Sequence, residues 1–247
     1  MDHAGTLSLG YTCSPGERGS NEICNGADDN GSGTIGILNV VKALVKVKEH
    51  LKRSVVVVWF SGEELGLEGS WHYVRNPIFP LDKTVYMMNL DMIGYAHTNN
   101  NRVSALGGGT SDSAENHIRE LNRKYNYIET DITPSAGGGS DHVPFMAEGI
   151  PGVFFHTGVS NNTNYHRTSD TADKISYEGL TTIAEMSFEL IHFVANDSSF
   201  SVPVGALGTP IKRPALVTEE EKKQSCHHLI LNPYVDKVSN FMQSGER

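Results

Sequence analysis

The stretch Ser54–Phe60 reads SVVVVWF, and the polar run SGEE (Ser61–Glu64) follows it at once. A short apolar run rich in β-branched and aromatic residues predicts a strand that is buried on both faces. Strands of this kind occur in parallel or mixed sheets that are covered by helices on each side. The run SGEE would then lie at the carboxyl end of a central strand.

Segments with helical and with strand patterns alternate around this stretch. Ile37, Val41, Leu44 and Val47 recur every three or four residues, which predicts an amphipathic helix that begins at Gly33. The other predicted elements are helices at 65–74, 113–125 and 175–194, and strands at 84–91, 102–106 and 152–156. Alternating strands and helices are typical of an α/β sandwich, and a chain of 247 residues is long enough to bury a sizeable core.

The sequence changes character near residue 200. Pro203, Pro210 and Pro214 mark an extended segment, and the charged run TEEEKK follows it. We therefore expect one α/β domain over residues 1–200. We expect an extended tail over residues 201–247, to which the sequence assigns no role.

Charge and hydropathy exclude several classes of partner. The formal net charge is -9, whereas proteins that bind the nucleic-acid backbone need clustered Lys and Arg, so we expect no nucleic-acid partner. No apolar run is long enough to span a bilayer. The three cysteines allow at most one disulfide and lack the spacing of a structural zinc site. The opening residues MDHAGTLSLG lack the basic and apolar regions of a signal peptide.

Two pairs of acidic residues lie where an α/β protein holds ligands, near the carboxyl ends of strands. Asp28 and Asp29 belong to the Gly-rich loop GADDNGSG just before the first predicted helix, where an aspartate also serves as an ordinary helix cap. Glu63 and Glu64 closely follow the apolar stretch. Two adjacent glutamates at a sheet edge repel each other unless they share a cation, so this pair indicates a metal site.

Two further positions complete the set. Asp91 ends an apolar strand in MNLDMIG, and a buried carboxylate there is costly unless a metal or a basic group pairs with it. His166 follows Tyr165 in the polar loop NYHRTSDT, and a single loop histidine is more often without function. Each position alone has an ordinary structural explanation. Their occurrence together along one chain predicts a site for divalent cations.

The motifs that carry these residues resemble those of metallopeptidase family 28, the co-catalytic zinc aminopeptidases related to glutamate carboxypeptidase and glutaminyl cyclase. The matching segments are the DH-G start at residues 2–5, then GADDNGSG, EELGLEGS, NLDMIG, GGSDHVPF and YHRTSDT, followed by a closing helix, and they extend over residues 2 to about 195. The resemblance implies a three-layer α/β/α sandwich with a central mixed, mostly parallel sheet. It also implies a zinc-dependent aminopeptidase that acts on peptides with a free N-terminus.

The resemblance further implies a role for each residue of the site. Asp29 would bridge two zinc ions. Glu64 and His166 would hold one of these ions, and Asp91 would hold the other. Glu63 would be the general base, because its neighbour Glu64 is fixed on the metal while Glu63 is free to accept a proton.

The remaining residues of the pattern have supporting roles. Tyr165 would donate a hydrogen bond to the developing oxyanion, and its alternative role is to pack the loop. Asp28 and Asn30 would shape the loop of the bridging aspartate, with a non-proline cis peptide directly before Asn30. Asp2 would orient a histidine ligand, and Asp141 would support the wall of the pocket.

The family's remaining ligand is a histidine two residues before the aspartate that Asp2 matches, so it would fall one position before Met1. We therefore expect a chain that is truncated at its N-terminus, lacks its first strands and holds one zinc ion more firmly than the second. Two alternatives stay open. One is a carboxypeptidase or a glutaminyl cyclase, which works with a single zinc ion, and the other is an impaired fragment or scaffold domain without catalysis. Relatives of this family are often exported, and the compartment of this chain stays open.

Overall fold

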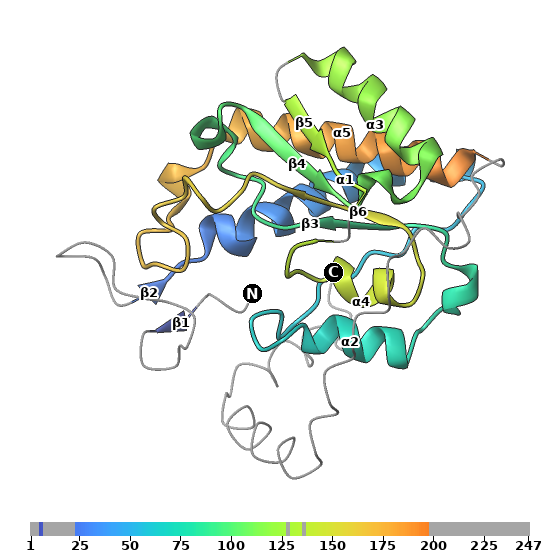
Figure 1. The fold of residues 1–247 in the computed structure, drawn as a ribbon, viewed down its shortest axis with the longest axis horizontal. Helices are drawn as coiled ribbons and strands as arrows, with labels where there is room; N and C mark the ends of the chain where they lie inside the picture. Colours follow the sequence, from blue (N-terminus) through green and yellow to red (C-terminus); the bar gives the residue numbers. More distant parts are fainter. Residues whose placement is uncertain (1–4, 7–22, 127–128, 135–136, 198–247) are drawn as a thin grey trace, which may run out of the picture. The chain divides into compact units, whose positions relative to one another are not determined.

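The computed structural model describes residues 5–6, 23–126, 129–134 and 137–197, and its central feature is a four-stranded sheet (Figure 1). In spatial order the strands are β3 (Met87–Leu90), β6 (Gly152–His156), β4 (Arg102–Leu106) and β5 (Glu129–Ile132). β3 is parallel to β6 and β4 is parallel to β5, whereas β4 and β6 are antiparallel. The sheet is therefore mixed and mostly parallel, as the resemblance implies.

Helices cover both faces of the sheet (Figure 1). The helices on one face are α1 (Gly33–Val47), α3 (Asp112–Tyr125) and α5 (Tyr177–Asn196), and those on the other are α2 (Glu68–Arg75) and α4 (His142–Ala147). The short helical turns are η2 (Ala27–Ser32), η3 (Lys48–His50), η4 (Leu81–Lys83), η5 (Ala96–Asn99), η6 (Gly108–Thr110) and η7 (Ala172–Lys174). A separate antiparallel pair consists of β1 (Gly5–Thr6) and β2 (Ile23–Cys24). The expected three-layer α/β/α arrangement is confirmed.

Three apolar clusters of buried residues lie in the described part of the chain, and the two larger ones involve different helices. The larger cluster joins the sheet to the helices on its α1 face, and its enclosed members include Val103, Ile118, Val153, Ile183 and Leu190. The smaller of these two joins α2 to α4, and its buried members are Trp71, Val74, Phe145 and Ile150. Burial of such side chains is the main favourable contribution to folding. The smaller cluster therefore fixes α2, the helix that follows the two predicted site glutamates.

Local signals explain where α3 and α5 begin. The hydroxyl of Ser111 accepts a hydrogen bond from the N–H of Ala114 at 3.4 Å, at the start of α3. The hydroxyl of Ser176 accepts one from the N–H of Gly179 at 3.4 Å, at the start of α5. A serine in this position satisfies a backbone N–H that has no partner inside the helix.

Most elements agree with those predicted. The strands at 102–106 and 152–156 are confirmed with their bounds, and the helix at 113–125 begins one residue earlier. β3 is shorter than the strand predicted at 84–91. α2 begins three residues later than residue 65, because the residues before it form a hydrogen-bonded turn. β5 and α4 were not predicted, since both are short and lack a clear apolar period.

The predicted strand at Ser54–Phe60 is wrong. The segment has no regular secondary structure, and it pairs with no strand among the residues that the structure describes. A cavity of about 860 Å³ is lined both by this segment and by Val85–Leu90, which contains β3. Because no described strand lies against the segment, Val56, Val58 and Trp59 are 44%, 38% and 50% exposed instead of buried.

Some expectations concern features outside this sheet. None of the helices in the described ranges is both long enough and apolar enough to cross a membrane. Cys24 is disulfide-bonded. Asp2 and the tail predicted at 201–247 also lie outside them, so their expected roles stay predictions.

Candidate metal and active site

The loop that carries Asp29 is fixed directly before α1. This loop, η2, is kinked, and its Asp29–Asn30 peptide is cis, as the resemblance implies. The Nδ2 of Asn30 donates a hydrogen bond to the carbonyl of Leu90 at 3.1 Å, and its Oδ1 accepts one from the N–H of Met92 at 3.3 Å. Asn30 therefore binds the backbone on both sides of Asp91. These two bonds set the separation between the loop of Asp29 and the end of β3.

The close approach of α1 to β3 depends on Gly33. A Cβ atom at this position would lie 2.2 Å from the carbonyl oxygen of Leu90, which is far inside contact distance. The N–H of Gly33 donates instead to the Oδ1 of Asn30 at 2.9 Å. Only glycine lets the start of α1, and with it the loop of Asp29, lie this close to the sheet.

Glu63 and Glu64 lie on a tight turn directly before α2. The carbonyl of Glu63 accepts hydrogen bonds from the N–H groups of Gly66 at 3.0 Å and Leu67 at 2.8 Å. Gly62 and Gly66 have φ angles of 68° and 99°, which glycine adopts without strain. The turn leaves both glutamate side chains half-buried, and both line the cavity.

Two left-handed backbone positions accompany the predicted ligands. His166 has a φ of 53°, and Met92, directly after Asp91, has a φ of 57°. Such conformations cost a non-glycine residue roughly 1–3 kcal/mol and occur mainly where the surroundings fix them, often at functional sites. The Tyr165 ring lies beside the His166 ring, with 3.7 Å between the ring centroids.

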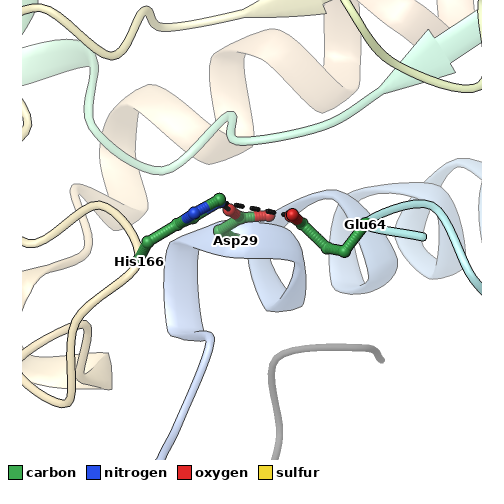
Figure 2. Close-up of side chains that lie close together, drawn as sticks. All are labelled: Asp29, Glu64 and His166. Carbon is green, nitrogen blue, oxygen red and sulfur yellow. Dashed lines mark ion pairs between the residues drawn. The ribbon is translucent and has the colours of Figure 1, made fainter. Parts of the chain in front are cut away.

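Asp29, Glu64 and His166 come from distant parts of the chain and meet at one point (Figure 2). The Nε2 of His166 lies 3.1 Å from the Oδ2 of Asp29 and 3.2 Å from the Oε1 of Glu64. One ligand atom from each residue lies within 4.8 Å of the other two. Two carboxylates and an imidazole are donors that zinc commonly binds in proteins. The three residues therefore fit a zinc ion.

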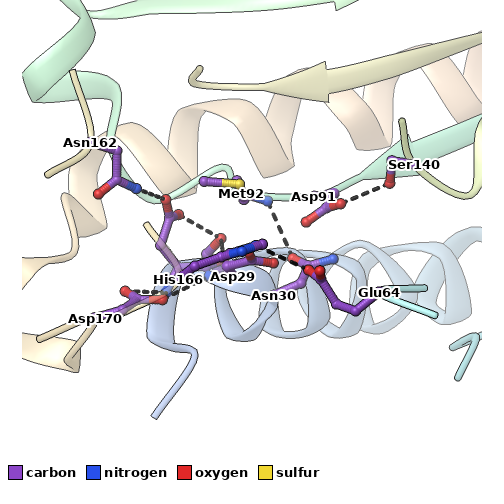
Figure 3. Close-up of polar contacts among 11 residues, drawn as sticks. Asp29, Asn30, Glu64, Asp91, Met92, Ser140, Asn162, His166 and Asp170 are labelled. Carbon is purple, nitrogen blue, oxygen red and sulfur yellow. Dashed lines mark hydrogen bonds and ion pairs between the residues drawn. The ribbon is translucent and has the colours of Figure 1, made fainter. Parts of the chain in front are cut away.

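Asp91 lies at the end of β3 and outside this group of three (Figure 3). Its Oδ2 accepts a hydrogen bond from the hydroxyl of Ser140 at 2.7 Å, and that hydroxyl accepts one from the Nδ2 of Asn89 at 2.7 Å. The Oδ1 of Asp91 is buried and has no hydrogen-bond partner among the residues that the structure describes. A buried carboxylate oxygen without a donor is costly, and a cation shared with Asp29 would satisfy it.

The acidic side chains of the site raise one another's pKa. Burial raises the pKa of Glu63 to about 9, with further contributions from the charges of Asp91 and Glu64. Burial and the charge of Asp29 raise the pKa of Asp91 to about 7. Asp141, which precedes α4 and lines the same cavity, contributes to both shifts. A divalent cation would oppose these shifts, because it stabilises the charged carboxylates.

The same acids also raise the pKa values of His166 and Tyr165. Burial alone would lower the pKa of His166, but hydrogen bonds to Asp29 and Glu64 outweigh burial and raise the pKa to about 9. Burial raises the pKa of Tyr165 above its usual value, and the charges of Asp29 and Glu64 raise it further. The phenol of Tyr165 therefore keeps its proton at neutral pH and is able to donate a hydrogen bond.

Asp28 connects three loops of the site and is fully buried. Its Oδ1 accepts hydrogen bonds from the N–H of Gly94 at 2.8 Å and from the hydroxyl of Ser32 at 3.0 Å. Its Oδ2 accepts one from the Nδ2 of Asn162 at 3.0 Å, on the loop that leads to the histidine. Burial raises the pKa of Asp28 to about 7. Both carboxylate oxygens are occupied within the protein, so Asp28 supports the loops and does not face the cation.

The structure places every predicted site residue except Asp2, which lies outside the described residues. Three contributors were not predicted: Ser140, Asn162 and Asp170. Ser140 belongs to the motif GGSDHVPF and Asp170 to the motif YHRTSDT, so both lie in segments that match the family motifs. Nothing in a sequence shows which way a loop side chain points, and no signal separated them from their polar neighbours.

A mixed α/β sheet with an aspartate directly after one of its strands, and with two more acids and a histidine that fit a metal ion, is typical of α/β proteins that hold a ligand at the carboxyl ends of strands. The chain belongs to peptidase family M28, whose family model matches residues 1–191. The family resemblance seen in the motifs is thereby confirmed.

Relatives share the same part of the chain. Aminopeptidase YwaD of Bacillus subtilis is 34% identical over 170 residues, which cover 65% of this chain and 36% of the relative. Leucine aminopeptidase 2 of Trichophyton rubrum is 32% identical over 202 residues, which cover 71% of this chain and 39% of the relative. The crystal structure of BSAP, a zinc aminopeptidase from Bacillus subtilis, matches with 28% identity and a TM-score of 0.57, over 70% of this chain and 43% of that one. The chain spans less than half the length of each of these proteins.

Proposed function

We propose that this chain forms the zinc centre of an aminopeptidase, an enzyme that hydrolyses the first peptide bond of a peptide with a free N-terminus. The observation that carries the proposal is the convergence of Asp29, Glu64 and His166 at one point, with Glu63 lining the same cavity as Asp29 and Glu64. Membership of family M28 supports hydrolysis of peptide bonds. The names of the aminopeptidase relatives support action at the N-terminus, and the zinc aminopeptidase from Bacillus subtilis supports zinc as the cation.

Two zinc ions are part of the proposal. The first is held by Asp29, Glu64 and His166, and the second by Asp29 and Asp91. The buried Oδ1 of Asp91, which has no hydrogen-bond partner among the described residues, supports the second ion. The first ion has three protein ligands in the described part of the chain and the second has two, so the first binds more tightly. Zinc supplies Lewis-acid polarisation of the scissile carbonyl and of the attacking water.

Glu63 is the general base in this proposal. It lies on the same turn as Glu64 but outside the group of three ligands, so its carboxylate is not needed to hold the cation. Burial and neighbouring acids raise its pKa, and bound cations bring that pKa down again. The ionised carboxylate accepts a proton from the attacking water and returns it to the nitrogen of the leaving amine.

Tyr165 stabilises the charge that develops on the substrate. Its ring is placed beside His166, and its phenol keeps its proton at neutral pH. It donates a hydrogen bond to the carbonyl oxygen of the substrate as that oxygen becomes negative. The acidic surroundings of Glu63 also attract the protonated amino group of a peptide, which favours action at the N-terminus.

Hydrolysis of aminoacyl p-nitroanilides by the zinc-loaded protein tests the function. The variant Glu63→Gln is compared with Glu68→Gln, a matched control because Glu68 is exposed at the start of α2. We expect Glu63→Gln to lose about 10²- to 10⁴-fold in activity with its zinc content unchanged. The control should keep the wild-type rate. Loss of zinc from Glu63→Gln would mean that the base and the ligand are exchanged.

A second substrate separates the alternatives. A peptide with an N-terminal Gln is offered to the same zinc-loaded protein. Cyclisation of that residue without hydrolysis of the nitroanilides would indicate a glutaminyl cyclase. Zinc binding without turnover of either substrate would indicate a binding or scaffold domain and would contradict the proposal.

A further inference from the structure

Asp170 accepts hydrogen bonds from the backbone of the loop that carries Asp29. Its side chain is 2% exposed, and its carboxylate accepts three hydrogen bonds from two successive N–H groups. The N–H of Asp28 donates to Oδ1 at 2.9 Å and to Oδ2 at 3.1 Å, and the N–H of Asp29 donates to Oδ2 at 3.1 Å. The N–H of Ala27 donates to the backbone carbonyl of Asp170 at 3.2 Å. Three consecutive residues of the loop are therefore bound to one residue.

Asp170 also lies close in the sequence to the predicted ligand His166. Asp170 lies four residues after His166, on the same loop. Its N–H donates to the carbonyl of Arg167 at 3.1 Å, so it is joined to the histidine by a short hydrogen-bonded turn. Asp28 and Asp170 are 142 residues apart in the sequence. The segment that carries the histidine ligand nevertheless binds the N–H groups of Ala27, Asp28 and Asp29.

We propose that Asp170 is a positioning residue that fixes the bridging aspartate, Asp29, relative to His166 and thereby sets the zinc affinity of the centre. The proposal rests on the proposed function, because it takes Asp29, Glu64 and His166 as the zinc ligands. It adds a residue that contacts neither the cation nor the substrate. Asp170 acts through the backbone of Asp29.

The chemistry of the contact explains why the residue is an aspartate. An ionised carboxylate makes stronger hydrogen bonds to N–H groups than a neutral acceptor does, and its two oxygens accept from two successive residues at once. An asparagine has nearly the same shape but only one acceptor oxygen, and its NH₂ group would face an N–H that also donates. That substitution therefore removes the attraction without creating a cavity.

A second contact runs between the same two loops. The Nδ2 of Asn162 donates to the Oδ2 of Asp28 at 3.0 Å, and the N–H of Asn164 donates to the Oδ1 of Asn162 at 3.0 Å. The two loops are therefore joined on both sides of His166. With this second contact in place, loss of the Asp170 contact should shift Asp29 without separating the loops.

The test compares Asp170→Asn with Asp173→Asn. Asp173 is exposed, accepts a hydrogen bond from the hydroxyl of Thr171 at 2.5 Å and pairs with Lys174 at 2.9 Å, so it undergoes the same chemical change outside the site. Zinc affinity is measured by competition with a chromogenic chelator. The absorption spectrum of the cobalt-substituted protein reports the geometry around the ion, and circular dichroism reports the fold.

We expect Asp170→Asn to bind zinc about 10- to 100-fold more weakly than wild type, with an altered cobalt spectrum and an unchanged circular dichroism spectrum. Asp173→Asn should match wild type in all three measurements. Wild-type zinc affinity and cobalt spectrum in Asp170→Asn would overturn the proposal. Failure of the wild-type protein to bind zinc would instead overturn the proposed function.

A second variant covers the case in which Asp170→Asn does not fold. Asp170→Glu keeps both acceptor oxygens and the charge, but its longer side chain must displace the backbone of Asp29. We expect this variant to fold and to bind zinc at least about tenfold more weakly than wild type. Zinc affinity equal to that of wild type would show that the position of this carboxylate does not govern the centre.

Discussion

The Nε2 atom of His166 lies 3.2 Å from the Oε1 atom of Glu64, although the two residues belong to segments far apart in the sequence. The same nitrogen lies 3.1 Å from the Oδ2 of Asp29. The imidazole is therefore held by two carboxylates at once, near the point where a cation bound by all three residues would lie. His166 is also only half-buried, so its replacement should affect cation binding more than folding.

Replacement of His166 by Gln should weaken zinc binding by at least about tenfold, because glutamine is polar but has no imidazole nitrogen to bind the metal. Competition with a chromogenic chelator measures the change. The control is His97→Gln, since His97 is exposed in η5 and lies outside the group of ligands. Equal zinc affinity in the two variants would exclude His166 from the metal centre.

Replacement of Asp91 by Asn should remove the weaker of two zinc-binding events and leave the tighter one, because only the second ion depends on Asp91. Equilibrium dialysis at increasing zinc concentrations, with the metal measured by mass spectrometry, separates the two events. Asp82→Asn is the matched control, since Asp82 is exposed and pairs with Lys83 at 3.9 Å. The same number of bound ions in wild type and Asp91→Asn would contradict the proposal of two ions.

The sequence predicted that Glu63, Glu64 and Asp91 lie near one another because acids that follow apolar segments tend to collect at one edge of a sheet. Asp91 directly follows β3, and the strand predicted at 84–91 is confirmed only over residues 87–90. Glu63 and Glu64 follow a segment that is not paired as a strand, yet they line the same cavity as Asp91. The turn before α2, in which two glycines are left-handed, positions the two glutamates, a role that the sequence predicts for a paired strand.

The features that could not be predicted depend on contacts between distant parts of the chain. Ser54–Phe60 has the composition of a central strand, but strand pairing needs a neighbour, and composition does not show whether one is present. The orientation of Asp170 is set by the N–H groups of residues 27–29, which no local pattern reveals. Ser140 is a similar case, since only the folded chain shows that it donates to Asp91.

Replacement of Ser140 by Ala should lower the free energy of unfolding of the metal-free protein by about 1–3 kcal/mol, because the buried Asp91 carboxylate loses its hydrogen-bond donor. Urea denaturation in the presence of a chelator measures this loss. Ser187→Ala is the matched control, since that buried hydroxyl donates only to the carbonyl of Ile183 within α5, at 2.7 Å. A loss no larger than that of the control would show that Asp91 does not depend on Ser140.

The pH dependence of stability should report on His156, which stacks on Phe154 with 4.6 Å between the ring centroids. Its Nδ1 accepts a hydrogen bond from the N–H of Gly158 at 3.0 Å, and burial lowers its pKa below the usual 6.5. Below pH 6.5 the unfolded chain therefore binds a proton that the folded chain does not, and the free energy of unfolding falls as the pH falls. Above that pH both states are neutral at this residue, and its contribution to stability is fully present.

The variant His156→Gln should show a smaller fall in the free energy of unfolding between about pH 7.5 and about pH 5.5, because it has no proton to gain in this range. The difference in slope from wild type should be at most about 1.4 kcal/mol per pH unit, the value for one proton. Urea denaturation across this range, with chelator present, gives both slopes. His97→Gln should keep the wild-type slope, since His97 is exposed. Identical slopes in wild type and His156→Gln would mean that His156 is as easily protonated in the folded chain as in the unfolded one.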